Sequence, residues 1–238
     1  MSNTLDLGGT LVEVVYKDIK HVHLSVYPPT GTVRITAPRR TNIQTLRAFA
    51  ISRLGWIRDQ QKKLRGQDRQ PPREYLDRES HYLWGRRYLL SVQEADAAPR
   101  VSRRHSRILL QVRPEADAQT REAVMNQWYR EQIRAVAPEL IAKWEPVMGV
   151  KVSRYFVQRM KTKWGSCNPN AATIRLNSEL AKKPRECLEY IIVHEMVHLL
   201  ERNHTERFRA LMDRFLPHWQ HARKRLNAEP LGHEEWAY

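Results

Sequence analysis

The run His194-Glu-Met-Val-His-Leu-Leu-Glu-Arg-Asn-His204 constrains this chain more than any other segment. Residues four apart on an α-helix lie on the same face, so His194 and His198 can reach a common point. Two imidazoles placed in this way can bind one Zn²⁺ ion, and Glu195 stands where a carboxylate can take a proton from metal-bound water. His204 becomes a third ligand if the chain turns directly after the helix. Three protein ligands leave a fourth position for water, which is typical of catalytic zinc.

Apolar residues surround this motif and predict that its helix is buried. Residues 188–193 read Leu-Glu-Tyr-Ile-Ile-Val directly before it. Imidazoles and a carboxylate in a buried segment need partners, and a metal supplies them. Pro184 suits the first turn of this helix, and Asn203 can end it and cap the next one. A second helix over residues 205–216 would then carry His204 near its start.

The rest of the chain predicts a mixed α+β protein. Strand patterns occur at residues 11–16, 21–27, 33–37, 82–92, 101–112, 150–157 and 173–176, and helical patterns at residues 41–65, 116–144 and 218–226. Pro138 is expected to kink or break the longest helix. The C-terminal third of the chain is mainly helical. We place a domain boundary near residue 115, between an N-terminal α+β region (1–115) and a C-terminal region that contains the histidine motif (116–238).

Composition excludes several protein classes. The 238 residues contain no apolar run long enough for a membrane span, and the N-terminus lacks the basic and apolar parts of a secretory signal. The two cysteines, Cys167 and Cys187, lack C-x-x-C spacing, which favours a reducing compartment and hence the cytoplasm. Nothing in these patterns indicates an oligomeric state.

The charge of the chain is strongly positive. Lys and Arg number 41 against 26 Asp and Glu, which gives a formal net charge of +15. This balance favours an anionic partner, with nucleic acid the first candidate and acidic protein segments the next. Simple solubility of an Arg-rich protein explains the charge equally well. Residues 146–178 contain no acidic residue, so we expect positive potential near the histidine motif.

Three segments of this chain together match one known family. They read Arg-Met-Lys-Thr-Lys-Trp-Gly-Ser-Cys at residues 159–167, Ile-Arg-Leu-Asn at 174–177, and the histidine motif with Asn203-His204. This combination resembles the YgjP-like metallopeptidases, bacterial zincins related to the SprT and Wss1-like proteases, most strongly over residues 150–216. The resemblance implies a zincin-like fold, in which a small mixed sheet packs over the motif helix and substrate adds along an edge strand. Residues 116–238 would form this zincin-like metallopeptidase core.

The same resemblance implies the roles of the motif residues. It makes His194, His198 and His204 the ligands of one Zn²⁺ ion and Glu195 the catalytic base. The spacing of the histidines is also that of metzincins, but their motif has Gly where this chain has Glu201. A carboxylate from farther along the chain, as in gluzincins, is the main rival for the third ligand. The carboxylates in question are Glu206, Glu229 and Glu234.

The motif predicts metal-assisted hydrolysis of a peptide bond in a peptide or protein substrate. Zn²⁺ lowers the pKa of its bound water toward ~7, and Glu195 takes the proton and passes it to the leaving amine. The oxyanion needs a second stabiliser. Trp164 and Gly165 are candidates for the substrate cleft, with a tight turn and a core Trp as the equal alternative. The oxyanion candidates are Arg159, Lys161, Lys163 and a backbone N–H near Gly165.

Other groups near the motif receive simpler interpretations. Cys167 is expected to be a small buried residue rather than a thiolate ligand. His218 and His221 are not at i, i+4 spacing, so we expect them at the surface.

Two other functional classes compete with a peptidase. One is a nucleic-acid-binding protein with structural zinc, and the other is a zinc hydrolase acting on non-peptide amides. Glu195 argues against the first, because a structural site has no need of a carboxylate beside its ligand. The charge also suggests a combination, a peptidase that acts on proteins associated with nucleic acid.

Overall fold

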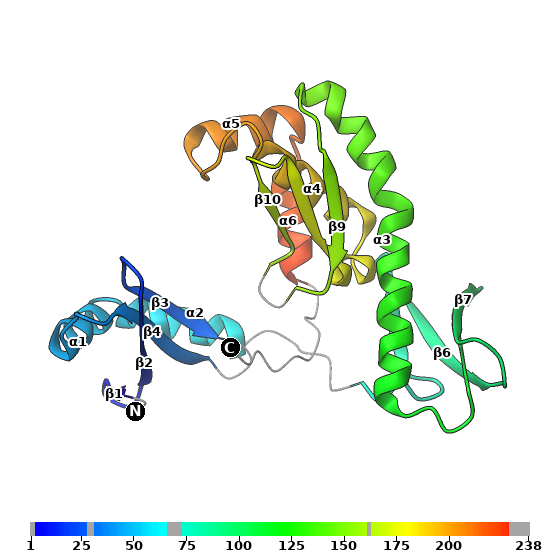
Figure 1. Cartoon of the computed structure of the whole chain (residues 1–238), viewed down its shortest axis with the longest axis horizontal. Coiled ribbons are helices and arrows are strands. Elements are labelled where there is room, and N and C mark those ends of the chain that lie inside the picture. Colours follow the sequence, from blue (N-terminus) through cyan, green and yellow to red (C-terminus); the bar gives the residue numbers. More distant parts are fainter. Residues whose placement is uncertain (1–2, 28–30, 66–72, 161–162, 229–238) are drawn as a thin grey trace. The chain divides into compact units, whose positions relative to one another are not determined.

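The computed structural model describes residues 3–27, 31–65, 73–160 and 163–228. The described chain forms two compact units, one within residues 3–65 and the other within residues 73–228 (Figure 1). The units therefore divide before Arg73, whereas the sequence placed a boundary near residue 115. That position lies inside the second unit, because the strands of residues 80–112 pack against the long helix that follows them.

The first unit is a four-stranded sheet with two helices. The strands are β1 (Asn3–Asp6), β2 (Leu11–Lys17), β3 (His23–Tyr27) and β4 (Thr32–Pro38), in the order β1-β2-β4-β3, followed by α1 (Ile43–Ser52) and α2 (Leu54–Arg65). Alternate residues of β2 and β4, such as Val14 and Ile35, are buried against Leu46 and Ile57 of the helices. The single helix predicted for residues 41–65 is thus interrupted at Arg53, which caps α1.

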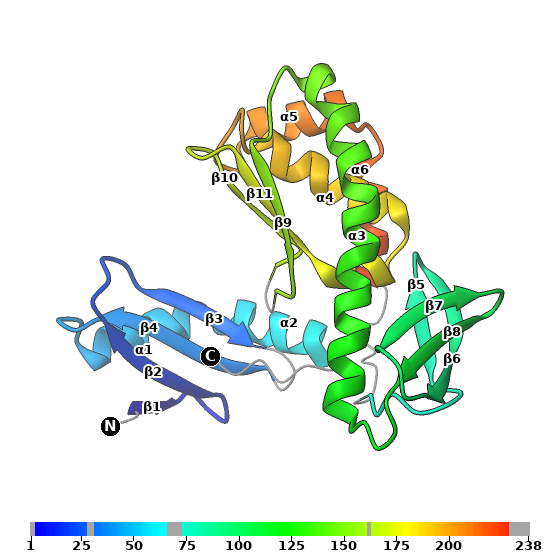
Figure 2. The same ribbon diagram turned by 45° about the vertical axis from the view of Figure 1, so that its right-hand side comes forward.

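The second unit begins with another four-stranded sheet, which packs on one long helix. Its strands are β5 (Ser80–Leu83), β6 (Arg86–Glu94), β7 (Arg100–Arg104) and β8 (Arg107–Val112), in the order β5-β6-β8-β7. The helix α3 (Ala118–Met148) begins at the Asp117 cap and ends at Gly149, whose backbone is left-handed. It continues through Pro138, so the predicted break is absent. Figure 2 shows α3 running along this sheet and on to the rest of the unit.

The remainder of the second unit surrounds one buried helix, α4 (Arg185–Val197). A three-stranded sheet of β9 (Arg154–Gln158), β10 (Gly165–Asn168) and β11 (Thr173–Asn177) contacts α4 through β10 and β11. Its order is β10-β11-β9, so β10 is an edge strand. The helices α3, α5 (Glu206–Phe215) and α6 (Trp219–Ala228) also contact α4. A short 3-10 helix, η1 (Ser178–Lys182), leads into α4.

These elements confirm the predicted α+β class. Small mixed sheets and helices make up the described chain, and strands such as β4 and β8 alternate buried residues with more exposed ones, as half-buried strands do. Within the described residues, no helix is both long enough and apolar enough to cross a membrane.

The β5–β6 turn fastens the four-stranded sheet to the segment before α4. The N–H of Trp84 donates to Ala181 O at 2.8 Å, and that of Gly85 donates to Lys182 O at 3.2 Å. Gly85 has a φ of 76°, and a Cβ built on it would lie 2.8 Å from Pro184 Cγ. Only glycine meets both demands, because an L-residue is strained in this conformation and has no room here.

We predict that Gly85→Ala destabilises the second unit more than Gly149→Ala does. Both glycines are left-handed, so each substitution costs about 1–2 kcal/mol of backbone strain. Gly149 has open space around its Cβ position, whereas the Gly85 substitution adds a clash with Pro184, worth a further ~1–3 kcal/mol. Urea unfolding followed by tryptophan fluorescence measures both. Equal midpoints for the two variants would contradict the packing argument.

Candidate active site

The end of α4 carries the histidine motif. His194 and Glu195 lie in the last turn of α4, and His198 is its C-cap, with its N–H donating to His194 O at 3.3 Å. The helix therefore ends earlier than predicted, before Asn203. Thr205 rather than Asn203 caps α5, because its side chain accepts a hydrogen bond from the N–H of Phe208 at 3.3 Å. Pro184 takes the N-cap position, one residue before the predicted first turn.

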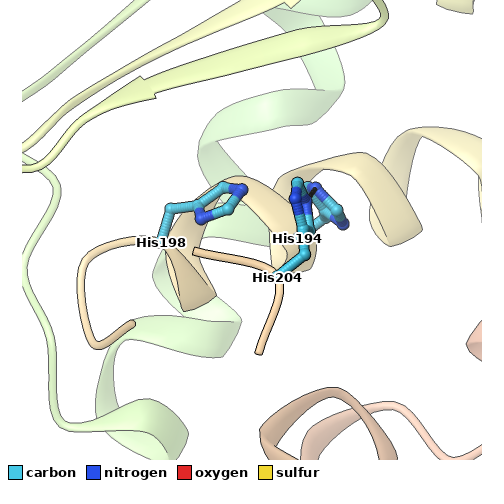
Figure 3. A group of neighbouring side chains, drawn as sticks. All are labelled: His194, His198 and His204. Atoms are coloured by element: carbon cyan, nitrogen blue, oxygen red, sulfur yellow. Dashed lines mark hydrogen bonds between the residues drawn. The ribbon is translucent and has the colours of Figure 1, made fainter. Parts of the chain in front are cut away.

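The turn after α4 brings the three histidines together. His204 lies in the loop before α5, and its Nε2 is 3.0 Å from Nε2 of His194. One ring nitrogen from each of His194, His198 and His204 lies within 4.8 Å of the others. Figure 3 shows the three imidazoles gathered from the end of α4 and from this loop. The ring of Phe208 packs against all three imidazoles, with ring centroids 4.7–4.9 Å apart.

The protonation state of these imidazoles suits metal binding. Burial, followed by the nearby His198 and His204, lowers the pKa of His194 to about 3, and burial also lowers the pKa of His198. Neutral imidazole is the form that binds metals. His198 Nδ1 lies 3.1 Å from Glu201 O, which can accept its N–H and leave Nε2 as the ligand atom. Nδ1 of His194 is buried without a hydrogen-bond partner among the described residues. The donor set therefore fits a divalent metal ion.

Glu195 is buried directly beside these histidines. Its residue is 4% exposed, and burial raises the pKa of its carboxyl to about 8, with Lys163 acting in the opposite direction. The backbone of β10 lies against it: a Cβ built on Gly165 would be 2.6 Å from Glu195 Oε1 and 2.9 Å from Ile191 Cγ2. Gly165 therefore allows β10 to approach the carboxylate more closely than any other residue could.

A cleft of about 400 Å³ lies over the histidines and Glu195. Of the other residues predicted for the site, Lys163 and Gly165 line it. Trp164 does not line it and packs against the core instead. Arg159 does not line it either, and its guanidinium pairs with Glu122 at 2.8 Å. Lys161 lies outside the described residues.

Sequence reasoning missed three polar residues of the cleft, which are Ser166, Asn170 and Arg202. Arg202 and Asn170 both line it, and Arg202 Nη2 donates to Asn170 Oδ1 at 2.6 Å. Asn170 lies in the turn between β10 and β11, so this bond joins the sheet to the turn that follows α4. Residues 32 positions apart in sequence meet here, and only the fold reveals that they do.

The remaining candidates lie as follows. Cys167 lines the cleft and is half-buried rather than buried, because β10 borders the cleft. Burial, with a contribution from Glu195, raises the pKa of its thiol to about 11, so it stays protonated at neutral pH. His218 and His221 are exposed, as predicted. Glu206 is exposed and outside the histidine group, while Glu229 and Glu234 lie outside the described residues.

Asn177 holds the segment that leads into β10. It is buried at the end of β11, and its Nδ2 donates to Met160 O and Lys163 O, each at 2.8 Å. Its Oδ1 accepts from the N–H groups of Met160 and Glu179 at 3.3 and 3.1 Å. One amide therefore fixes the backbone on both sides of residues 161–162 and the start of η1.

We predict that Asn177→Ala destabilises the second unit strongly. The change leaves the carbonyls of Met160 and Lys163 without this donor, and each buried group left unpaired costs about 1–3 kcal/mol. Urea unfolding measures the loss. Asn168→Ala, at an exposed asparagine of the same sheet whose Oδ1 accepts only in a local turn, serves as the control. An Asn177→Ala variant no less stable than the control would contradict this role.

Comparison with known proteins identifies the family. The model of the YgjP-like metallopeptidase domain matches residues 20–229. No curated protein matches the chain. Among solved structures, the metallopeptidase zymogen abylysin of Pyrococcus abyssi is 18% identical, with a TM-score of 0.35, covering 37% of this chain and 90% of its own. The metallopeptidase zymogen jannalysin of Methanocaldococcus jannaschii is 21% identical, with a TM-score of 0.34, covering 37% and 91%. The match over residues 20–229 shows that this chain belongs to the YgjP-like metallopeptidases and is a zinc metallopeptidase, a hydrolase.

Proposed function

We propose that this protein hydrolyses peptide bonds with one zinc ion held by His194, His198 and His204 and with Glu195 as the general base. The convergence of three imidazoles and a buried carboxylate on one cleft carries the proposal. The lowered pKa values of His194 and His198 support it, since they keep these ligands neutral. The fit to a zincin-like arrangement is supported by the contacts of the small mixed sheet β9–β11 with α4.

The chemistry divides between the metal and the protein. Zinc supplies Lewis-acid chemistry, because it polarises a carbonyl oxygen and makes water a stronger acid. Glu195 accepts a proton from the attacking water and delivers it to the leaving amine. Because this carboxylate is buried, water solvates it weakly, which makes it a stronger base than an exposed glutamate. Its position beside the first histidine sets it within the same cleft as the proposed metal.

We assign the second stabiliser of the oxyanion to Lys163. It lines the cleft and acts electrostatically on Glu195. A cation near a developing negative charge stabilises the transition state more than the ground state. Arg159 is less suitable, because it pairs with Glu122 and does not line the cleft.

The substrate is proposed to lie in extended form beside β10. An edge strand offers unpaired backbone groups to a peptide, and β10 is the edge strand that borders the cleft. Gly165 keeps this edge close to Glu195. Trp164, in contrast, is better explained as a core residue.

Two further features extend the proposal. The net charge of +15 supports substrates that are proteins associated with nucleic acid. Neither cysteine forms a disulfide within the described residues, which supports a reducing compartment, the cytoplasm. The buried Glu195 and the cleft over the histidines favour a catalytic zinc over a structural one, because a structural site is closed by a fourth ligand.

We predict that Glu195→Gln abolishes peptidase activity and leaves zinc binding intact. The amide keeps the shape of the side chain but cannot accept the proton, so the rate should fall by at least about 10²-fold. Dye-labelled casein serves as the substrate, and bound zinc is measured by elemental mass spectrometry of the purified protein. Glu206→Gln is the matched control and should retain both activity and zinc. A Glu195→Gln variant that cuts casein at the wild-type rate would exclude the mechanism.

We also predict that His204→Ala loses zinc. Removal of one of three ligands should lower the affinity by more than about 100-fold, since even the loss of an outer-shell partner costs 10–100-fold. Competition with a chromophoric chelator measures this affinity. The exposed His221 provides the control, because His221→Ala removes an imidazole outside the histidine group. Unchanged affinity in His204→Ala would move the third ligand elsewhere.

A further inference from the structure

The four-stranded sheet of the second unit has one face that its own helix does not cover. Alternate residues such as Tyr88, Leu90, Ile108 and Leu110 are buried in the same core as Met125 of α3. The strand registers place the intervening residues together on the opposite face, which we call the outer face of β5–β8. In Figure 2 no other drawn element of this unit lies beyond that face.

The outer face carries arginine without any acid. Arg107 pairs with Leu89 of β6 and with Arg104 of β7, and Arg87 pairs with Tyr82 of β5, so all of these side chains share this face. Arg100, two pairs along β7 from Arg104, lies on it as well. The registered residues that complete this face are serines, glutamines and Leu109.

These arginines are available for a partner. Arg87, Arg100, Arg104 and Arg107 are exposed, and Arg100 donates to Gln111 within the face. The guanidinium groups of Arg87, Arg104 and Arg107 form no ion pair or hydrogen bond with any described residue. Leu89, in the middle of the sheet, is 37% exposed. The four arginines thus share this face with Leu89 and Leu109 on the two central strands and with Tyr82 on the edge strand β5.

We infer that the outer face of β5–β8 binds single-stranded nucleic acid. Guanidinium groups bind phosphates in a bidentate manner and stack on bases, and every cation on this face is an arginine. Unpaired bases can lie on these aromatic and apolar side chains while the arginines hold the backbone, which is how sheet surfaces bind single strands. The serines and glutamines supply neutral hydrogen-bonding groups for base edges.

This chemistry favours a single strand over two other anionic partners. An acidic peptide would pair with the arginines but would leave the exposed Leu89 and the half-buried Tyr82 without a matching surface. A duplex hides its bases in grooves, and the major groove admits a helix or a two-stranded ribbon but not the broad face of a four-stranded sheet. The inference names the surface on which the nucleic-acid part of the proposed function rests, and it does not depend on peptidase chemistry.

The test measures binding of fluorescein-labelled 20-mers of dT and U to the full-length protein by anisotropy over a salt series. Arg104→Gln with Arg107→Gln should weaken binding at least about 10-fold near 0.1 M salt and reduce the log–log salt slope by ~0.7 for each arginine that contacts a phosphate. Tyr82→Ser should weaken binding roughly 5- to 100-fold through lost stacking, with the salt slope unchanged.

The control variant removes two positive charges from a surface outside the outer face of β5–β8. Arg39→Gln with Arg40→Gln changes two exposed arginines of the first unit and should leave binding within about twofold of the wild-type value. Thermal melting checks that each variant folds. Glu195→Gln should bind the oligonucleotides normally, and the Arg104/Arg107 variant should cut dye-labelled casein normally, so a failure of the peptidase proposal and a failure of this one give different results.

Four outcomes would overturn the inference. In the first, the Arg104/Arg107 variant binds as well as the wild type, and in the second, the Arg39/Arg40 control loses as much affinity as the Arg104/Arg107 variant, so that net charge alone governs binding. In the third, a duplex 20-mer binds as tightly as the single strands. In the fourth, polyglutamate displaces the single strands at equal charge concentration.

Discussion

The close approach of β10 to α4 is the contact on which the site depends. Gly165 lets the strand backbone lie against Glu195 and Ile191, so the edge of the sheet and the carboxylate share one cleft. Asn177 reinforces this approach, because its buried amide binds the backbone at Met160 and Lys163 just before β10. A strand placed farther away would leave Glu195 solvated, and its basicity would fall toward that of an exposed carboxylate.

The end of α4 brings the three histidines together. The helix stops at Val197, and the chain turns sharply enough to return His204 to within 3.0 Å of His194. Burial of α4 against β10, β11 and three helices makes this arrangement rigid, since nine of its thirteen residues are buried. Rigid placement matters for a metal centre, because ligands fixed before the ion binds lose little conformational freedom on binding.

The sequence could predict the parts of this site that local spacing determines. The i, i+4 histidines and their neighbouring glutamate require only a helix, and His204 requires only a turn after it. The contributions of Arg202, Asn170 and Asn177 could not be predicted, because each depends on a contact between segments far apart in the chain. Local signals also misplaced a cap: Asn203 and Thr205 are both good N-cap residues, and the helix α5 is capped by Thr205.

The electrostatics of the cleft combine two opposing influences on one group. Burial raises the pKa of Glu195, and Lys163 lowers it. Arg202 is a second cation in the lining of the cleft. Glu195 is the one acidic residue among the described residues that line the cleft. The acid-free segment at residues 146–178 explains this balance, since it supplies the strands around the cleft without any competing carboxylate. Burial favours the neutral carboxyl and Lys163 favours the ionised carboxylate, so the balance between desolvation and positive charge in the cleft sets the basicity of Glu195.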